Sequence, residues 1–433
     1  MAKKKTALTI EERLQQALVP ANEQPYDVPE NWVWCRLGSV NLCLDAYRKP
    51  VNASERANRI GKIPYYGATG QVGWIDDYLT DEHLVLLGED GAPFLDLLKD
   101  KAYIISGKAW VNNHAHILKS SFGEFGNWYL MHYLNTVDYG DYVKGTTRLK
   151  LTQGSMQIMP FPLPPLAEQK RIVDRIEVLF AKLDEAKEKL QEVIDGFAVR
   201  KAAILHKTFT GELTKKWRAE NGVSDDSWEE KNFDEVANIK SNLVSPFDYL
   251  DYPHIAPDSI EKFTGRLLSY RSVREDNVKS PKHLFYKGQI LYSKIRPYLS
   301  KAVIAEVDGL CSADMYPIEA LCNAKYLLRY MLSTEFLVQS TTAGSRSLLP
   351  KINQKELSAI KVPLPSLSEQ HEIVRLLDAL LARERKAQQA AKEALANIEL
   401  MKKAVLARAF RGELGTNREE EASALALLKE VLE

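Results

Sequence analysis

The chain has 433 residues, which is too many for a single hydrophobic core, so we expect two or more domains. Its 58 Lys and Arg residues balance its 58 Asp and Glu residues. This balance excludes a protein-wide basic field of the kind that marks many nucleic-acid binders, although a local basic surface stays open. The cysteines, Cys35, Cys43, Cys311 and Cys322, form no Cys-x-x-Cys pair, which favours buried thiols over zinc or disulfide roles.

Residues 1–30 are predicted to form a short helix and a lead-in to the first domain. Thr9 and Glu12 have the spacing of a capping box, and apolar residues follow with helical periodicity. The segment has no apolar core of signal-peptide length, and the sequence has no apolar run of membrane length. We therefore expect a cytoplasmic protein without a membrane partner.

Residues 31–160 are predicted to form the first globular domain. Short apolar runs alternate here with Gly, Pro and Asp. The runs at 84–87 and 102–105 have the length and composition of strands, whereas 127–134 has the pattern of a short buried helix. This mixture predicts a compact domain that contains both helices and strands.

Residues 161–215 are predicted to contain a long helix. From Ile172 to Phe197 its apolar residues recur at alternating intervals of four and three, which is the spacing of a seam that packs on another helix. A second long helix is predicted in residues 362–415, and its seam is rich in Ala where the first is rich in Leu. Because small residues let a helix approach closely, we expect the two to pair with each other. The alternative is that each helix packs only on its own domain.

Residues 216–361 are predicted to form the second globular domain, and residues 416–433 a C-terminal helix. The second domain begins as the first does, with Trp228 and its neighbours echoing Trp32. The stretch 289–292 is strand-like and 325–332 is helix-like, but the bodies of the two domains are otherwise dissimilar.

The two long helices are copies of one element. The octapeptide at 162–169, Pro-Leu-Pro-Pro-Leu-Ala-Glu-Gln, recurs at 363–370 as Pro-Leu-Pro-Ser-Leu-Ser-Glu-Gln. The match continues without a gap to the helix ends, where Phe-Thr-Gly-Glu-Leu at 209–213 corresponds to Phe-Arg-Gly-Glu-Leu at 410–414. A gapless match of this length indicates an internal duplication.

Taken together, these motifs resemble those of the specificity (S) subunit of type I restriction-modification systems. The resemblance covers nearly the whole chain. It rests on the paired helix openings and Gly-Glu-Leu ends, the Pro-Glu-Asn-Trp opening at 29–32, and the stretches 63–70 and 293–298.

The resemblance implies an α/β (α+β) fold, in which two DNA-recognition domains are separated by two long antiparallel helices that form an intramolecular coiled coil with a pseudo-two-fold internal repeat. Each domain would read one half of a bipartite site in double-stranded DNA. The helices would set the spacing and dock two modification (methyltransferase) subunits that methylate adenine, and restriction (motor nuclease) subunits would join the full complex. The resemblance implies no cofactor on this chain, S-adenosylmethionine in the modification partner, and ATP and magnesium in the restriction partner.

Four loops carry the side chains that we predict to contact DNA. Base reading needs donors and acceptors on short loops, with phosphate contacts alongside that fix the register. Residues 62–71 lie in a loop punctuated by Gly, and 144–150 form a basic, hydroxyl-rich loop; in the second domain we match them with the residues after strand 289–292 and with 344–347. The alternative for each is an ordinary solvated loop. The candidates are Lys62, Tyr65, Tyr66, Thr69, Gln71, Lys144, Thr146, Thr147, Arg148, Lys150, Lys294, Arg296, Ser345 and Arg346.

The sequence predicts no catalytic residue and no metal ligand. It lacks the Asn/Asp-Pro-Pro-Tyr/Phe loop of adenine methyltransferases, a phosphate-binding loop and a Gly-x-Ser-x-Gly elbow. His114 and His116 share a side of a predicted strand but have no third ligand nearby. We therefore expect a non-catalytic subunit. Two alternatives stay open: a coiled-coil scaffold whose heads bind protein without a DNA role, and a self-contained restriction-methylation enzyme.

Overall fold

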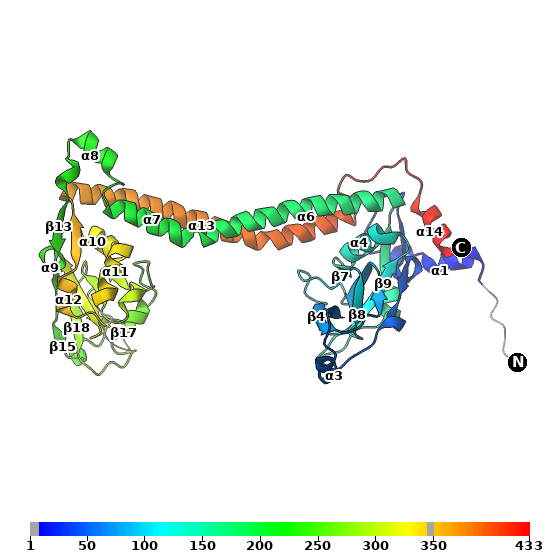
Figure 1. Ribbon diagram of the computed structural model, residues 1–433, viewed down its shortest axis with the longest axis horizontal. Coiled ribbons are helices and arrows are strands. Elements are labelled where there is room, and N and C mark those ends of the chain that lie inside the picture. Colours follow the sequence, from blue (N-terminus) through cyan, green and yellow to red (C-terminus); the bar gives the residue numbers. More distant parts are fainter. Residues whose placement is uncertain (1–7, 344–349) are drawn as a thin grey trace. The chain divides into compact units, whose positions relative to one another are not determined.

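The computed structural model describes residues 8–343 and 350–433. The chain divides into a first unit of residues 1–190 and 393–433 and a second unit of residues 191–392. Each unit combines small sheets, short helices and segments of the long helices (Figure 1). In the described part of the chain, no helix is both long and apolar enough to cross a membrane.

Two four-stranded sheets form the body of the first unit. Their strands are β2 (Asn41–Cys43), β3 (Ile63–Gly67), β4 (Gly70–Ile75), β5 (Thr80–Asp81), β6 (Leu84–Gly88), β7 (Ala102–Ile105), β8 (Lys108–Val111) and β9 (Ala115–Ser120). The strand orders are β2-β9-β6-β7 and β4-β3-β8-β5. The strands predicted at 84–87 and 102–105 are confirmed as β6 and β7.

Helices and two short strand pairs complete the first unit. They are α1 (Ile10–Ala17), β1 (Val33–Arg36), α2 (Leu37–Val40), α3 (Ala53–Asn58), α4 (Gly123–Leu134), β10 (Val143–Lys144), β11 (Lys150–Leu151), α5 (Gln153–Gln157), β12 (Pro160–Leu163) and α14 (Ala424–Leu432). The helix predicted at 127–134 is part of α4, which packs on β6, β7 and β9. The capping box of α1 is confirmed, because the backbone N–H of Glu12 donates to Thr9 Oγ1 and that of Thr9 to Glu12 Oε2.

The second unit has a four-stranded and a five-stranded sheet. Its elements are α8 (Lys215–Asn221), β13 (Glu229–Asn232), α9 (Phe233–Val236), β14 (Ala237–Ile239), β15 (Leu243–Val244), β16 (Pro253–Ile255), β17 (Arg271–Ser272), β18 (Lys282–Phe285), β19 (Ile290–Ser293), β20 (Ala302–Ile304), β21 (Gly309–Cys311), β22 (Met315–Ala320), α10 (Ala324–Met331), α11 (Thr334–Ala343), α12 (Gln354–Ser358) and β23 (Lys361–Leu364). The strand orders are β14-β22-β19-β20 and β15-β18-β21-β16-β17.

The two units share most of their topology although their sequences differ; β15, at the edge of the five-stranded sheet, has no counterpart in the four-stranded sheet. The order β2-β9-β6-β7 matches β14-β22-β19-β20, so the β6 strand corresponds to β19 and β9 to β22. In the other sheet, β3 pairs with β8 in parallel and with β4 antiparallel, and β16 pairs in the same way with β21 and β17. The hairpin β3–β4 therefore corresponds to β16, β17 and the long segment between them.

The long helices are α6 (Leu166–Asp195), α7 (Phe197–Phe209) and α13 (Leu367–Ala409). The first predicted helix is thus interrupted at Gly196, whereas its copy α13 is continuous. Glycine weakens a helix interior, and a Cβ at Gly196 would lie 2.5 Å from the Arg200 guanidinium. That guanidinium needs the space because it donates to the Val193 carbonyl and pairs with Glu384 of α13 at 2.8 Å.

The long helices pack together and run antiparallel, as predicted. In the first unit, where α6 lies alongside α13 (Figure 1), Asp184 pairs with Lys402 at 2.6 Å and Lys187 with Glu399 at 3.0 Å, so the chain advances in opposite directions along the two helices. The pair of Lys187 with Glu399 is half exposed on both sides and contributes little stability. The seam of α6 is only partly buried, since Leu179, Leu183, Ala186 and Leu190 are of intermediate exposure.

The end of each helix copy packs between two tyrosines. In the first unit, the ring of Phe410 lies 5.1 Å from that of Tyr129 and 5.3 Å from that of Tyr133, both on α4. In the second unit, Phe209 contacts Tyr326 and Tyr330 of α10 at 5.6 and 5.1 Å. The start of α6 and the end of α13 therefore lie in one core in the first unit. In the second unit, the start of α13 and the end of α7 lie in one core.

The repeated Glu-Gln of each helix opening is buried. Glu168 is 0% exposed and accepts hydrogen bonds from Trp32 Nε1 at 2.8 Å and Thr416 Oγ1 at 3.3 Å. Its counterpart Glu369 is also 0% exposed and accepts from Thr214 Oγ1 at 2.6 Å and Arg218 Nη1 at 2.7 Å. Each carboxylate thus binds the segment that follows the end of the other helix copy.

We predict that Arg218→Met lowers the free energy of unfolding by about 3–5 kcal/mol, because it leaves the buried carboxylate of Glu369 without its cation. Lys216→Met is the matched control on the same helix, where a side chain that is 88% exposed should change stability by no more than about 0.5 kcal/mol. Urea unfolding followed by tryptophan fluorescence measures both variants. Equal stability of the two variants would show that the buried pair of Glu369 and Arg218 does not stabilise the contact between the start of α13 and the segment that follows α7.

Candidate functional site

The hairpin β3–β4 presents part of the first predicted loop to solvent. Lys62, Thr69 and Gln71 are exposed at its start and turn. Tyr66 is half-buried against the ring of Tyr103. These side chains are available to a ligand, apart from the buried face of Tyr66.

Tyr65 is a correction to the predicted site. Neighbouring residues of a strand point to opposite faces, and Tyr65 takes the inner one, where it is 1% exposed. Its hydroxyl accepts from the Val51 backbone N–H and donates to the Val51 carbonyl, while the Arg56 guanidinium lies over its ring. Its role is therefore structural.

The second predicted loop is the connection between β10 and β11. Lys144, Thr146 and Thr147 are exposed. Gly145 has φ +120°, and a Cβ there would lie 2.4 Å from the Arg148 carbonyl, so the tight turn favours glycine. Arg148, with a side chain 59% exposed, pairs with Asp90 at 2.5 Å, and Lys150 pairs with Glu89 at 2.9 Å.

Both loops of the first unit meet at the end of β6. A Cβ on Gly88 would lie 3.0 Å from the Ala68 carbonyl in the hairpin turn. On the other side, the backbone N–H of Leu151 donates to the Glu89 carbonyl and that of Gly91 to Leu149. The structure therefore places the two predicted loops together, with Glu89 and Asp90 between them.

A buried ionic cluster anchors this strand end. Arg48 bonds Glu89 and lies 2.9 Å from Asp45, and His116 lies 2.6 Å from Asp45. Burial acts to raise the pKa of Glu89, but the hydrogen bonds from Arg48 and Lys150 outweigh it and hold the pKa below its ordinary value. Sequence reasoning missed Glu89 and Asp90, although an acidic pair directly after an apolar strand was visible.

Cys43, Asp45 and His116 have ligand atoms within 4.8 Å of one another, and two of these residues already bind each other. Both ring nitrogens of His116 already face acceptors, Asp45 Oδ2 and the Leu151 carbonyl. Burial raises the pKa of Cys43 to about 11. His114 instead contacts Asp90 at 2.7 Å.

In the second unit, the predicted residues lie at the end of β19. The Lys294 ammonium lies 5.1 Å from the centre of the Tyr316 ring, and Arg296 has φ +49°, an uncommon conformation for a residue other than glycine. The backbone N–H of Ile352 donates to the Lys294 carbonyl, so the segment that follows the second predicted loop reaches this strand end. Ser345 and Arg346 themselves lie outside the described residues.

The pairing of loops between the domains is wrong in one respect. Lys294 does not correspond to the loop at 62–71, because β19 is the counterpart of β6 and not of the hairpin. The isolated bridge between Asp90 and Lys150 recurs between Ile295 and Lys351, which makes Lys294 the counterpart of Glu89. The same place in the fold thus carries an acid in one unit and a base in the other.

Comparisons with known proteins agree with this duplicated organisation. The chain matches the family described as type I restriction modification DNA specificity domain twice, over residues 29–195 and 225–395. It is 34% identical over 410 residues to the type I restriction enzyme EcoDI specificity subunit of Escherichia coli, with 89% of each chain covered. The EcoBI specificity subunit of the same species is 28% identical over 288 residues, which cover 61% of this chain and 60% of that one. A crystal structure of the HsdS subunit from Thermoanaerobacter tengcongensis shares the fold, with a TM-score of 0.62 at 19% identity over 91% of this chain and 100% of that chain.

The chain therefore belongs to the family of type I restriction-modification specificity subunits, with one target recognition domain in each unit. Specificity subunits are the non-catalytic members of their complexes, so family membership confirms the expectation that the chain is not an enzyme.

We predict that Glu89→Gln lowers the free energy of unfolding at pH 7 by about 1–3 kcal/mol, because Arg48 and Lys150 lose a charged acceptor. A carboxyl with a lowered folded-state pKa stabilises the protein above its ordinary value of 4.5, and this contribution disappears as the pH falls through the lower folded value. The difference between wild type and variant should therefore narrow below pH 4.5 in urea titrations.

Glu82→Gln is the control, since Glu82 and its partner Lys119 are both largely exposed and the pair should contribute no more than about 1 kcal/mol. If the difference in unfolding free energy between wild type and Glu89→Gln does not change with pH, the charge of this carboxylate is not what anchors the strand end.

Proposed function

We propose that each target recognition domain reads one half of a bipartite site in double-stranded DNA, and that the reading surfaces are the ends of β6 and β19 with their adjoining loops. The observation that carries this proposal is the inversion of charge at matched positions of one fold. Glu89 and Lys294 occupy the same strand end, and His114 and Asp314 precede the matched strands β9 and β22. Glu89 itself is buried and anchors the strand end, so the exposed side chains beside it, Arg148 in the first unit and Arg296 in the second, would do the reading. A shared scaffold with divergent polar side chains at one place is what two different half-sites require.

The chemistry of these side chains suits the major groove. Arg bonds the O6 and N7 atoms of guanine, and a carboxylate accepts from the amino group of cytosine. Arg148 and Asp90 lie side by side at the end of β6, and Arg296 lies at the end of β19. The exposed Lys62, Lys144 and neighbouring threonines would supply the phosphate contacts that fix the register.

We propose recognition domains at 31–160 and 216–361, spacer helices within 161–215 and 362–415, an N-terminal lead-in at 1–30 and a C-terminal helix at 416–433. In this proposal the helix pair sets the gap between the half-sites and docks two modification subunits. Adenine methylation would then use S-adenosylmethionine held by those subunits, and ATP and magnesium would belong to the restriction subunits. The support is the family membership and the packing of α6 and α13.

We predict that replacing both Lys294 and Arg296 with Ala weakens DNA binding by the chain assembled with its modification partner. For each cation that no longer reaches a phosphate, the slope of log affinity against log salt should also become shallower by about 0.9. Filter binding to genomic DNA fragments at several salt concentrations measures both quantities.

Lys287→Ala is the matched control, because Lys287 is exposed at the opposite end of β19. Unchanged affinity and slope for the double variant, or an equal decrease for Lys287→Ala, would remove this strand end from the interface. If the assembly with the wild-type chain binds DNA at none of the salt concentrations, the alternative of a coiled-coil scaffold without a DNA role is favoured.

A further inference from the structure

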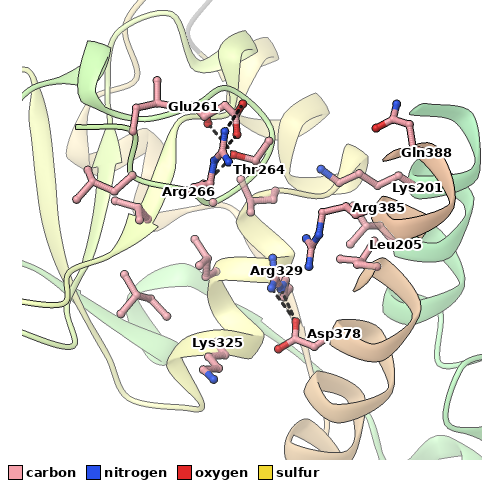
Figure 2. A pocket seen from close by; sticks show the side chains of 18 of the residues that line it. Lys201, Leu205, Glu261, Thr264, Arg266, Lys325, Arg329, Asp378, Arg385 and Gln388 are labelled. Carbon is pink, nitrogen blue, oxygen red and sulfur yellow. Dashed lines mark hydrogen bonds and ion pairs between the residues drawn. The ribbon is translucent and has the colours of Figure 1, made fainter. Parts of the chain in front are cut away.

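The second unit contains a cavity of about 1200 Å³ between its long helices and its recognition domain. Helices α7, α10 and α13 line one side, and the segment 261–270, which leads from β16 to β17, lines the other (Figure 2). Its floor is apolar, formed by buried Leu205, Leu328 and Leu381. Two apolar side chains on its wall are exposed, Leu268 at 53% and Tyr270 at 44%.

Basic side chains outnumber acidic ones around this cavity. Two of the cations are neutralised locally, since Arg329 pairs with Asp378 at 2.7 Å and Arg266 with Glu261 at 3.0 Å. In the described residues no carboxylate pairs with the remaining cations, which are Lys201, Lys325, Arg385 and Lys392.

Arg385 projects into the space between Lys201 and Arg329 (Figure 2). The Lys201 ammonium reaches a backbone carbonyl, that of Phe263. Burial lowers the pKa of Lys201, and repulsion from Arg329 and Arg385 lowers it further. The cavity is therefore a place where positive charges crowd together.

The first unit shows how the same place looks when it is neutralised. The alignment of the two helix copies makes Lys402 the counterpart of Lys201 and Asp184 the counterpart of Arg385. Lys402 and Asp184 form an ion pair of 2.6 Å. The nearby pair of His132 with Glu177 likewise matches that of Arg329 with Asp378. Arg385 stands where the first unit has Asp184, so the described residues around the cavity of the second unit carry an excess of positive charge.

We propose that this cavity binds an acidic, partly apolar peptide segment of a partner protein, with carboxylates on Arg385, Lys201 and Lys325. The planar guanidinium of Arg385 matches a carboxylate in two parallel hydrogen bonds. Leu268, Tyr270 and the leucine floor suit apolar side chains, which a peptide has and a DNA backbone does not. The proposal does not require the DNA-reading function, because it concerns side chains on the long helices, α10 and the β16–β17 segment, and none of the residues proposed to read DNA.

The test measures binding of a fluorescein-labelled peptide of alternating Glu and Leu to the full chain by fluorescence anisotropy at low salt. Arg385→Asp restores the residue type of the first unit and gives Lys201 a partner, so peptide affinity should fall at least about tenfold, the effect of removing one charge-assisted hydrogen bond. Arg383→Asp is the matched control, since Arg383 is exposed on the same helix and does not line the cavity. It should change affinity less than about twofold.

The proposal is overturned if Arg385→Asp leaves affinity unchanged, if Arg383→Asp weakens binding equally, or if a peptide of alternating Gln and Leu binds as well. A labelled DNA duplex that binds in an Arg385-dependent way, while the acidic peptide does not, would assign the cavity to the DNA backbone instead. Arg385→Asp should not lower the thermal unfolding temperature, because it removes a repulsion. A lower temperature would contradict the correspondence with Asp184, and Arg385→Gln would then repeat the binding test without an added charge.

Discussion

The fold depends on two buried carboxylates. A carboxylate that leaves water needs hydrogen-bond donors in fixed positions, since an unpaired buried charge costs several kcal/mol. Glu168 finds its donors in Trp32 and Thr416, and Glu369 finds its donors in Thr214 and Arg218. The start of each helix copy is therefore satisfied only when the segment beyond the other copy is in place. Burial raises the pKa of Glu168 even with these donors present.

This contact between each helix opening and the segment beyond the other helix copy, which we call the joint, explains why the octapeptide recurs. The Pro162 and Pro363 carbonyls each accept a tyrosine hydroxyl, from Tyr129 and Tyr326, and each helix opening thereby fixes the helix of its own recognition domain. The joint uses backbone carbonyls and a few buried side chains, so the rest of the domain is free to differ. The charge inversion between Glu89 and Lys294 is an example of a change that leaves the joint untouched. For this reason a duplicated frame is compatible with the proposed reading surfaces, which differ between the two domains.

Much of the fold could be predicted because it follows from local periodicity and from the repeat. The capping box at Thr9, the strands β6 and β7, and the pairing of the two long helices are all local or repeated signals, whereas the antiparallel direction of the pair was expected only from the family resemblance. The site was harder. Tyr65 and Tyr66 are identical in type, and only the strand's register decides which ring is buried. The correspondence of Lys294 with Glu89 depends on strand order, which the dissimilar domain sequences do not reveal. The interruption at Gly196 depends on where the Arg200 side chain lies, a contact with the other helix copy.

The central claim is that one chain joins two independent readers through a duplicated frame. The most direct measurement is a genome-wide map of methylated adenines in cells that carry this chain with its modification partner. The account predicts one asymmetric bipartite motif, with two specified parts separated by a gap of constant length in which any base is accepted. A single continuous motif, or a motif whose gap varies from site to site, would contradict it.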